Sequence, residues 1–226
     1  MERRNSMEIS IFDAVGPIMI GPSSSHTAGA AKLGRVAALI VGKPFKKVEF
    51  GLHGSFAKTY KGHGTDIALV AGVLGLNEAD ERLKDAFAIA KQQGIELRFY
   101  ETELDGMHEN SVRMTFYLDD KRTREIIGSS IGGGQIMIRS IDGFRAKIPL
   151  NSSTLVIRHE DKHGVLYRVT KILAEAGINI ATVTLTRQNR GALACAVIET
   201  DSFISDSIVK QLEEEAFLLS VQAINI

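Results

Sequence analysis

The sequence predicts an α+β protein of two domains, an N-terminal α/β domain at residues 1–150 and a smaller α+β domain at 151–226. The chain has 226 residues, a length that fits one large domain or two small ones. The polar stretch Asn151-Ser152-Ser153 indicates a linker. After it, the periods of the apolar residues give the order strand, helix, strand, strand, helix, strand, which is that of a ferredoxin-like unit.

Two helices of the first domain are marked by their start signals. Serines at 23–25 precede apolar residues that recur on one helix face, and Gly42 follows them as a stop. A glycine-rich stretch at 51–64 then leads to Thr65 and Asp66, which are expected to cap a second helix.

The remaining elements of this domain are a third helix at 78–92 and several strands. Strands are predicted where apolar and polar residues alternate, at 46–53, 95–100 and 112–118. The run Ser129–Gly134 is expected to interrupt two more short strands, which end near Pro149. This run forms either a backbone nest for an anion or a bend with tight packing.

The second domain has the clearer pattern. Its elements are expected in this order: strand 154–159, helix 165–176, strand 178–187, strand 192–199, helix 205–215 and strand 217–225. Asn189-Arg190-Gly191 has the chemistry of a hairpin turn. Cys195 alternates with the apolar Leu193 and Val197, so it is expected to be a core thiol and not a nucleophile.

Composition excludes several classes of protein. There are 27 Lys and Arg residues and 27 Asp and Glu residues, so the chain lacks the basic excess of nucleic-acid-binding proteins. The single cysteine, Cys195, excludes a disulfide within the chain and a zinc or iron–sulfur site made only of this chain's cysteines. The first ten residues lack the apolar stretch of a secretory signal, and no apolar run reaches the ~18 residues of a membrane span. A cytoplasmic location is therefore expected.

The stretch Gly21–Thr27, GPSSSHT, carries the strongest chemical signal. It places several hydroxyls and the imidazole of His26 at one helix N-terminus, where a carboxylate or phosphate binds well. The alternative is an ordinary helix cap, for which one serine is enough. A zinc site of His26, His63 and His108 is a further alternative, but no short metal-ligand spacing supports it.

Two further motifs carry polar side chains. His63 lies between two glycines just before a predicted helix, which suits a base or a substrate ligand. The alternative there is a flexible loop. His108 and Asn110 lie in Met107–Asn110, next to a predicted strand, and on their own they indicate only a polar surface loop.

GPSSSHT, GHGTD, HEN and the GGG run follow one another as in the beta chains of iron–sulfur-dependent L-serine dehydratases, which this sequence resembles. The resemblance implies conversion of L-serine to pyruvate and ammonia, in amino-acid degradation and gluconeogenesis, with threonine left open as a second substrate. It also implies a [4Fe–4S] cluster whose open iron acts as a Lewis acid on the substrate hydroxyl. Cysteines hold that cluster, so a separate alpha chain must supply it, and this chain alone is expected to be inactive.

The same resemblance assigns roles to residues of this chain. His63 is the first candidate for proton transfer and His26 the second. The residues expected to bind substrate are Ser24, Ser25, Thr27, Thr65, Asp66, His108 and Asn110, and no metal ligand is expected in this chain. The first domain is also similar to the allosteric substrate-binding domain of some phosphoglycerate dehydrogenases. The competing hypothesis is therefore a non-catalytic amino-acid sensor that binds an anion and dimerises.

The second domain, over residues 153–226, resembles the ACT domain family in the segments His159–Leu166 and Glu175–Ile180. That resemblance implies a small amino acid bound between paired modules, and hence a homodimer. The ligand contacts of serine-sensing ACT domains match His159, Asp161 and Asn179 here, while His163 stands where the family often has proline. The alternatives are a module that only dimerises and a His159 that is a plain surface residue at a strand end.

Overall fold

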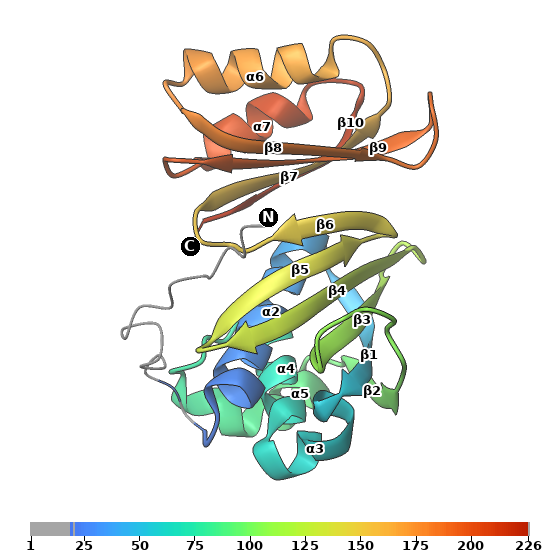
Figure 1. Cartoon of the computed structure of the whole chain (residues 1–226), viewed down its shortest axis with the longest axis vertical. Coiled ribbons are helices and arrows are strands. Elements are labelled where there is room, and N and C mark those ends of the chain that lie inside the picture. Colours follow the sequence, from blue (N-terminus) through green and yellow to red (C-terminus); the bar gives the residue numbers. More distant parts are fainter. Residues whose placement is uncertain (1–18, 20, 226) are drawn as a thin grey trace, which may run out of the picture.

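The computed structural model describes residue 19 and residues 21–225. The first ten residues, for which the sequence predicts no secretory signal, lie outside this range. The described chain has two parts, one above the other, and each is built on its own β-sheet (Figure 1). None of the described helices is long and apolar enough to cross a membrane.

The first part contains a six-stranded sheet in the order β2-β1-β3-β4-β5-β6. Its strands are β1 (Phe45–Gly54), β2 (Glu96–Glu101), β3 (Asn110–Leu118), β4 (Thr123–Gly132), β5 (Gln135–Ile141) and β6 (Phe144–Ile148). The pair of β1 and β2 is parallel, and β1 and β3 to β6 pair antiparallel with their neighbours. From β3 to β6 each strand therefore lies beside the next one in the chain.

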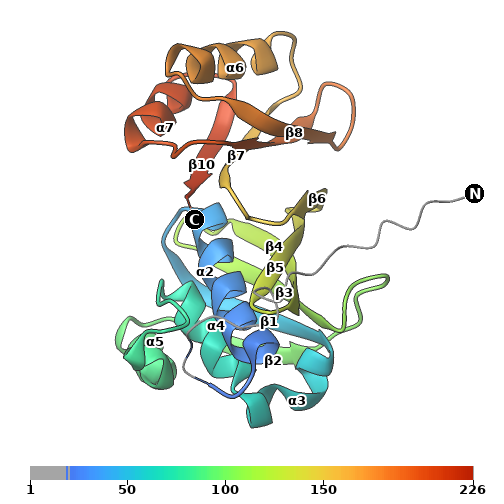
Figure 2. The ribbon, with the colours of Figure 1, turned by 60° about the vertical axis from the view of Figure 1, so that its left-hand side comes forward.

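Helices cover one face of this sheet, and Figure 2 shows α2, α4 and α5 on that side. The helical segments are η1 (Ser24–Ala28), α2 (Gly29–Val41), α3 (Ser55–His63), α4 (Thr65–Val73), η2 (Glu81–Asp85) and α5 (Ala86–Gln92). Helices α2 and α4 cross in close contact because glycines lie at the crossing. A Cβ placed on Gly72 would lie 2.1 Å from the carbonyl oxygen of Ala31, and one on Gly34 would lie 2.5 Å from that of Leu69.

The opposite face of the six-stranded sheet carries polar side chains. Glu49 on β1 accepts a hydrogen bond from the Tyr117 hydroxyl at 3.0 Å and forms ion pairs with Lys47 and Arg98. The hydrogen bond from Lys47 is the main cause that holds the pKa of Glu49 below its usual range. A sheet with one apolar and one solvated face explains why its strands alternate so regularly in sequence.

The second part is a four-stranded sheet in the order β10-β7-β9-β8, with two helices on the face that points away from the first part (Figure 1). Its elements are β7 (Ser153–Glu160), α6 (Val165–Glu175), β8 (Ile180–Arg187), β9 (Leu193–Thr200), α7 (Asp206–Glu213) and β10 (Leu218–Ile224). The predicted order of strands and helices is confirmed. Leu155 and Ile157 on β7 pack with Leu173 on α6 in the core under these helices.

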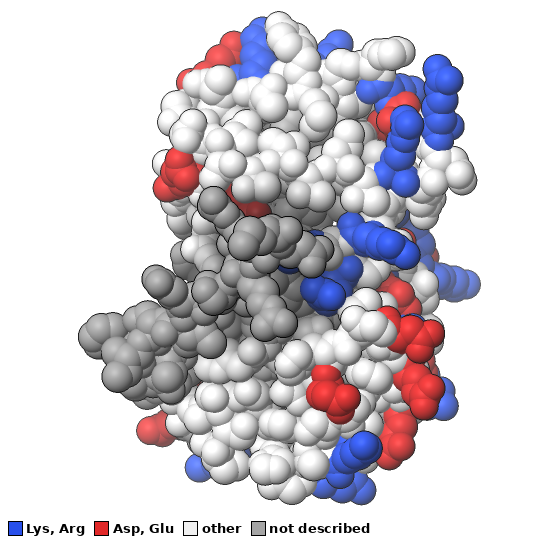
Figure 3. All heavy atoms as spheres, viewed as in Figure 1, with Lys and Arg blue, Asp and Glu red and all other residues white. Residues whose placement is uncertain are grey.

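The two parts meet through the other face of the four-stranded sheet. Val156, Cys195 and Val197 on that face belong to the same apolar cluster as the core of the first part. The Thr186 hydroxyl donates to the Arg145 carbonyl at 3.2 Å across this contact. In Figure 3, several Lys and Arg side chains lie at the level where the two parts meet.

The predicted core position of Cys195 is confirmed, because the residue is 3% exposed. Burial raises the pKa of the Cys195 thiol to about 11. At pH 8 the folded chain is therefore expected to react with a disulfide reagent at least ~100-fold more slowly than the unfolded chain. A colour assay with and without denaturant measures both rates, and comparable rates in the two states would contradict this burial.

Two expected boundaries were wrong because glycines lie inside or between helices. The stretch 51–64 is not a loop, since Ser55–His63 forms helix α3 with Gly62 inside it. Gly64, with a φ of 67°, separates α3 from α4. It is therefore Gly64, and not Thr65 or Asp66, that occupies the cap position of α4.

The predicted third helix is also divided, into η2 and α5, and Gly94, with a φ of 70°, follows α5. Ser129 and Ser130 do not interrupt a strand, since both lie within β4 and are buried. The turn comes after them, where Gly133 and Gly134 both have positive φ and join β4 to β5. Two consecutive residues with positive φ suit a two-residue hairpin turn.

Candidate functional site

The GPSSSHT and GHGTD motifs meet at η1, and the strand that leads into the GGG run lies beside them. The η1 segment contacts α3, α4 and β4. Gly29, the residue after η1, lies so close to β4 that a Cβ on it would be 2.1 Å from the Ser130 hydroxyl oxygen. The Ser111 hydroxyl donates to the His108 carbonyl at 2.6 Å and lies 2.7 Å from the Ser129 hydroxyl, which ties the HEN segment to the same strand.

The cap of this helical segment is Ser23. Its hydroxyl accepts a hydrogen bond from the backbone N–H of His26 at 3.1 Å, and its carbonyl accepts one from the N–H of Thr27 at 2.9 Å. One serine thus satisfies the helix start. Ser24 and Ser25 are half-buried, and neither supplies the cap hydrogen bond of η1.

His26 and His63 form a pair, with ring centroids 4.9 Å apart and an angle of 38° between the rings. Nε2 of His26 lies 3.2 Å from the Ser55 hydroxyl, and Nδ1 lies 3.4 Å from the Ser23 hydroxyl. The rings of His26 and Phe56 also pack edge to face, with their centroids 5.3 Å apart. His26 is half-buried and held from several sides, while His63, the last residue of α3, is exposed.

Burial, and secondly the nearby His63, lower the pKa of His26 below its usual range. His26 is therefore neutral at pH 7 and able to accept a proton. The unfolded chain takes up this proton near pH ~6.5, whereas the folded chain takes it up only at lower pH. The stability that comes from this group is thus present above that pH and is lost as the pH falls towards the folded-state pKa.

Wild-type protein is therefore expected to lose more free energy of unfolding between pH 8 and pH 5.5 than the His26→Gln variant loses. Urea unfolding at a series of pH values measures both slopes. The variant keeps the other histidines, so the difference between the slopes isolates His26. Parallel slopes would show that His26 has the same pKa in both states.

Buried hydroxyls surround the histidine pair. Thr27 is 2% exposed, and its hydroxyl donates to the His63 carbonyl at 3.3 Å, which links η1 to the end of α3. The hydroxyls of Thr65 and Ser130 are buried and have no hydrogen-bond partner among the described residues. An unpaired buried hydroxyl is costly. Both hydroxyls lie on elements that contact η1, so they add hydrogen-bonding capacity to this site.

The other predicted substrate residues of this part differ in their burial and in their hydrogen bonds. His108 is exposed, and its Nδ1 accepts a hydrogen bond from the backbone N–H of Asn110 at 3.1 Å. Oδ1 of Asn110 is buried without a partner among the described residues. The Asp66 carboxylate accepts from the N–H of Ile67 at 2.9 Å, so it serves the first turn of α4.

Sequence reasoning missed Ser55 and Phe56 as partners of His26. They stand at the start of α3, next to the HEN segment, because the N–H of Phe56 donates to the Glu109 carbonyl at 3.3 Å. Gly54 permits this approach, since a Cβ there would be 2.7 Å from the same oxygen. No short spacing signals the contact between residues 26 and 55. Within the described residues, no group of three or more His, Cys, Asp and Glu side chains is arranged to hold a metal ion.

The predicted ligand residues of the second part are divided between two ends of its sheet. His159 is 2% exposed, so the surface alternative for it is wrong. Asp161 accepts hydrogen bonds from the N–H of Gly191 at 2.9 Å and from Arg187 at 3.3 Å, and the Gly191 bond is the main cause that lowers its pKa. Asn179 donates to Asp201 at 2.5 Å before the start of β8, whereas Arg187 is the last residue of β8. A strand of that length separates them by roughly 25 Å.

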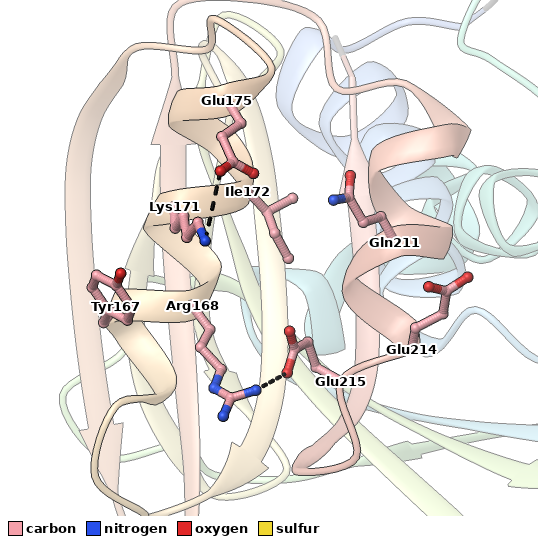
Figure 4. Close-up of a pocket in the computed structure, with 8 residues that line it drawn as sticks. All are labelled: Tyr167, Arg168, Lys171, Ile172, Glu175, Gln211, Glu214 and Glu215. Carbon is pink, nitrogen blue, oxygen red and sulfur yellow. Dashed lines mark hydrogen bonds and ion pairs between the residues drawn. The ribbon is translucent and has the colours of Figure 1, made fainter.

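A separate hollow of about 530 Å³ lies between α6 and α7 (Figure 4). Its charged groups are paired with one another, since Arg168 lies 3.1 Å from Glu215 and Lys171 lies 3.7 Å from Glu175. None of the predicted site residues lines it. Paired charges on an open helix surface give no indication of a ligand.

Comparison with known proteins places these features in context. The family model described as "Serine dehydratase beta chain" matches residues 10–92, and the one described as "ACT domain" matches residues 153–217. The chain is 40% identical over 215 residues to a probable L-serine dehydratase beta chain of Bacillus subtilis, covering 95% of this chain and 97% of that one. It is 41% identical over 202 residues to an L-serine dehydratase beta chain of Peptoniphilus asaccharolyticus, covering 89% and 91%. A D-3-phosphoglycerate dehydrogenase of Bacillus subtilis is 28% identical over 201 residues, which are 87% of this chain and 37% of that enzyme.

Proposed function

Since this chain belongs to the family of L-serine dehydratase beta chains, we propose that it completes the active site of a two-chain enzyme that converts L-serine to pyruvate and ammonia. The observation that carries this proposal is the meeting of His26 and His63 with buried hydroxyls around one helix start. We assign residues 1–150 to the substrate-binding domain and residues 151–226 to the ACT domain, a division that the two separate sheets support.

The start of η1 is the proposed binding place for the substrate carboxylate. Ser24 and Ser25 supply hydroxyls there, and a helix start favours a negative charge. The Thr27 hydroxyl donates a hydrogen bond to the His63 carbonyl, which holds η1 and the end of α3 together. Thr65 and Asp66, at the start of the next helix, together with His108 and Asn110, are proposed to form the remaining polar wall.

His63 is the proposed base that removes the α-proton of serine. It is exposed and can reach a bound substrate, and its neighbour His26 is neutral and held by Ser23 and Ser55. His26 lies beside His63, with the ring centroids 4.9 Å apart, and is the second candidate. Over the whole reaction serine loses one water to give aminoacrylate, and hydrolysis of its imine form takes up one water and releases ammonia.

The residues of this chain do not fit a [4Fe–4S] cluster. Such clusters need several cysteine thiolates. The single cysteine of the chain, Cys195, is buried in β9 with a raised pKa and lies in the second part, away from the histidine pair. We therefore propose that the cluster belongs to a separate alpha chain, which docks over the histidine pair.

The ACT domain is proposed to bind a small amino acid between two copies of the chain. Asp161 and Asn179 lie at opposite ends of β8 within one copy, so a single ligand that meets both needs a second copy. Strand β8 is an edge strand with exposed residues along most of its length, which supports pairing through this side. His159 is proposed to donate a hydrogen bond to the ligand or accept one from it, since its Nε2 is buried and has no partner among the described residues.

The test is purification of the tagged chain from its own host without oxygen. The expected result is a complex with a second chain that contains iron and sulfide and forms pyruvate from L-serine. L-Threonine serves as the second substrate in the same assay. A chain that is isolated alone, without iron and without activity, would contradict the proposal and favour a non-catalytic amino-acid sensor.

A further inference from the structure

A groove with cationic walls lies at the junction of the two sheets, apart from the proposed serine site. Its volume is about 350 Å³. The charged residues that line it are Lys43, Lys121, Arg122, Arg124 and Arg158, and no acidic residue is found among its described lining residues. Arg124 comes from β4 and Arg158 from β7, so the groove is walled by both parts of the molecule.

Two of these guanidinium groups share one carboxylate. Nε of Arg124 donates to an oxygen of Asp142 at 2.7 Å, and Nη1 of Arg158 lies 3.4 Å from the same oxygen. The other oxygen of Asp142 accepts from the N–H of Glu125 at 2.9 Å. Arg124 is only 6% exposed, and burial together with the charge of Arg158 lowers its pKa. One carboxylate thus faces two guanidinium groups.

The remaining groups of the groove add to this positive excess. Nε of Arg158 is buried and has no hydrogen-bond partner among the described residues. Lys43 and Lys121 are exposed and form no ion pair within residues 21–225. Arg122 is the exception, since Asp120 neutralises it through hydrogen bonds of 3.0 and 2.5 Å. Lys43 also lies close enough to Asp120 to help lower the pKa of that carboxyl. Five cations of the groove are therefore balanced by two carboxylates, Asp120 and Asp142.

We propose that this groove binds a doubly charged oxyanion, a phosphate group that is free or carried by a small metabolite. Guanidinium groups recognise phosphate through paired hydrogen bonds, and lysines add charge to such sites. This excess of positive charge in the groove matches a dianion better than a singly charged carboxylate. A phosphate bound between Arg124 and Arg158 would also hold the two sheets together. This site requires neither serine nor an iron–sulfur partner, so it stands apart from the proposed dehydratase function.

The test is calorimetric titration of the full-length chain with inorganic phosphate at low salt. The Lys43→Gln/Lys121→Gln double variant is expected to bind phosphate at least about tenfold more weakly than wild type. The matched control is Lys84→Gln/Lys91→Gln, which removes the same charge from exposed positions on η2 and α5 and should bind like wild type. Arg158→Gln, at the inner wall, should abolish measurable binding.

Three further titrations test which anions the groove prefers. Sulfate is expected to compete with phosphate, acetate is expected to bind at least about tenfold more weakly, and sodium chloride of equal ionic strength should not reproduce the heat. Equal phosphate affinity in the two double variants would overturn the proposal. Equal binding of acetate and phosphate would overturn the preference for a dianion.

Discussion

An assembled complex that carries His63→Gln is expected to turn over L-serine at least ~100-fold more slowly than the wild-type complex. Glutamine keeps the size and polarity of the side chain but cannot take up a proton. His63 is exposed at the end of α3, so its loss should not disturb folding. The measurement is the rate of pyruvate formation at saturating serine, with KM determined in the same series.

The matched control is Lys61→Gln, which alters an exposed residue on the same helix and should leave turnover unchanged. Full turnover by His63→Gln would remove His63 as the base. The same assay on His26→Gln decides between the two candidates. A Ser55→Ala variant with a changed pH profile, but an unchanged fold, would identify Ser55 as the residue that positions His26.

Gly72→Ala is expected to destabilise the protein by about 3 kcal/mol. The added Cβ would lie 2.1 Å from the Ala31 carbonyl oxygen and 2.8 Å from the Arg35 nitrogen, which are backbone atoms of α2. Backbone atoms of a packed helix cannot move aside as the end of a flexible side chain can. Urea unfolding gives the free energy of unfolding directly.

Gly62→Ala is the control for that experiment. Gly62 also lies in a helix, but a Cβ on it would meet nothing within 4 Å. Alanine favours a helix over glycine, so a gain of about 0.5 kcal/mol is expected. Similar losses in both variants would mean that the crossing of α2 and α4 is looser than these distances indicate.

The second part of the fold was predictable because each of its signals is local. Buried residues of α6 recur with the period of a helix, and β7 is a short run of consecutive apolar residues. Gly191 has the positive φ that its turn requires. Helix α3 was not predictable in the same way. Its sequence contains Gly62 and few apolar residues, and its ends are set by Gly54 and Gly64, whose left-handed backbone a loop would also use.

The motifs of the candidate site were visible one by one, because each concentrates hydroxyls, glycine or histidine in a few residues. The contacts between them were not. His26 meets Ser55 and His63 across large separations in the chain, and Ser130 meets Gly29 from another strand. Such meetings depend on which face of the sheet α2 covers and on the register of β4, and neither is encoded by the spacing within a motif.

By itself, the sequence determined the α+β class, the order of elements in the second part, the core position of Cys195 and the four motifs that mark the family. Short-range periodicity and residue chemistry are sufficient for these. Only the tertiary structure decided that Ser23 caps the helix, that burial lowers the pKa of His26, and that Arg124 and Arg158 share Asp142. Each of these depends on burial and on distances between separate elements, which arise only when the chain has folded.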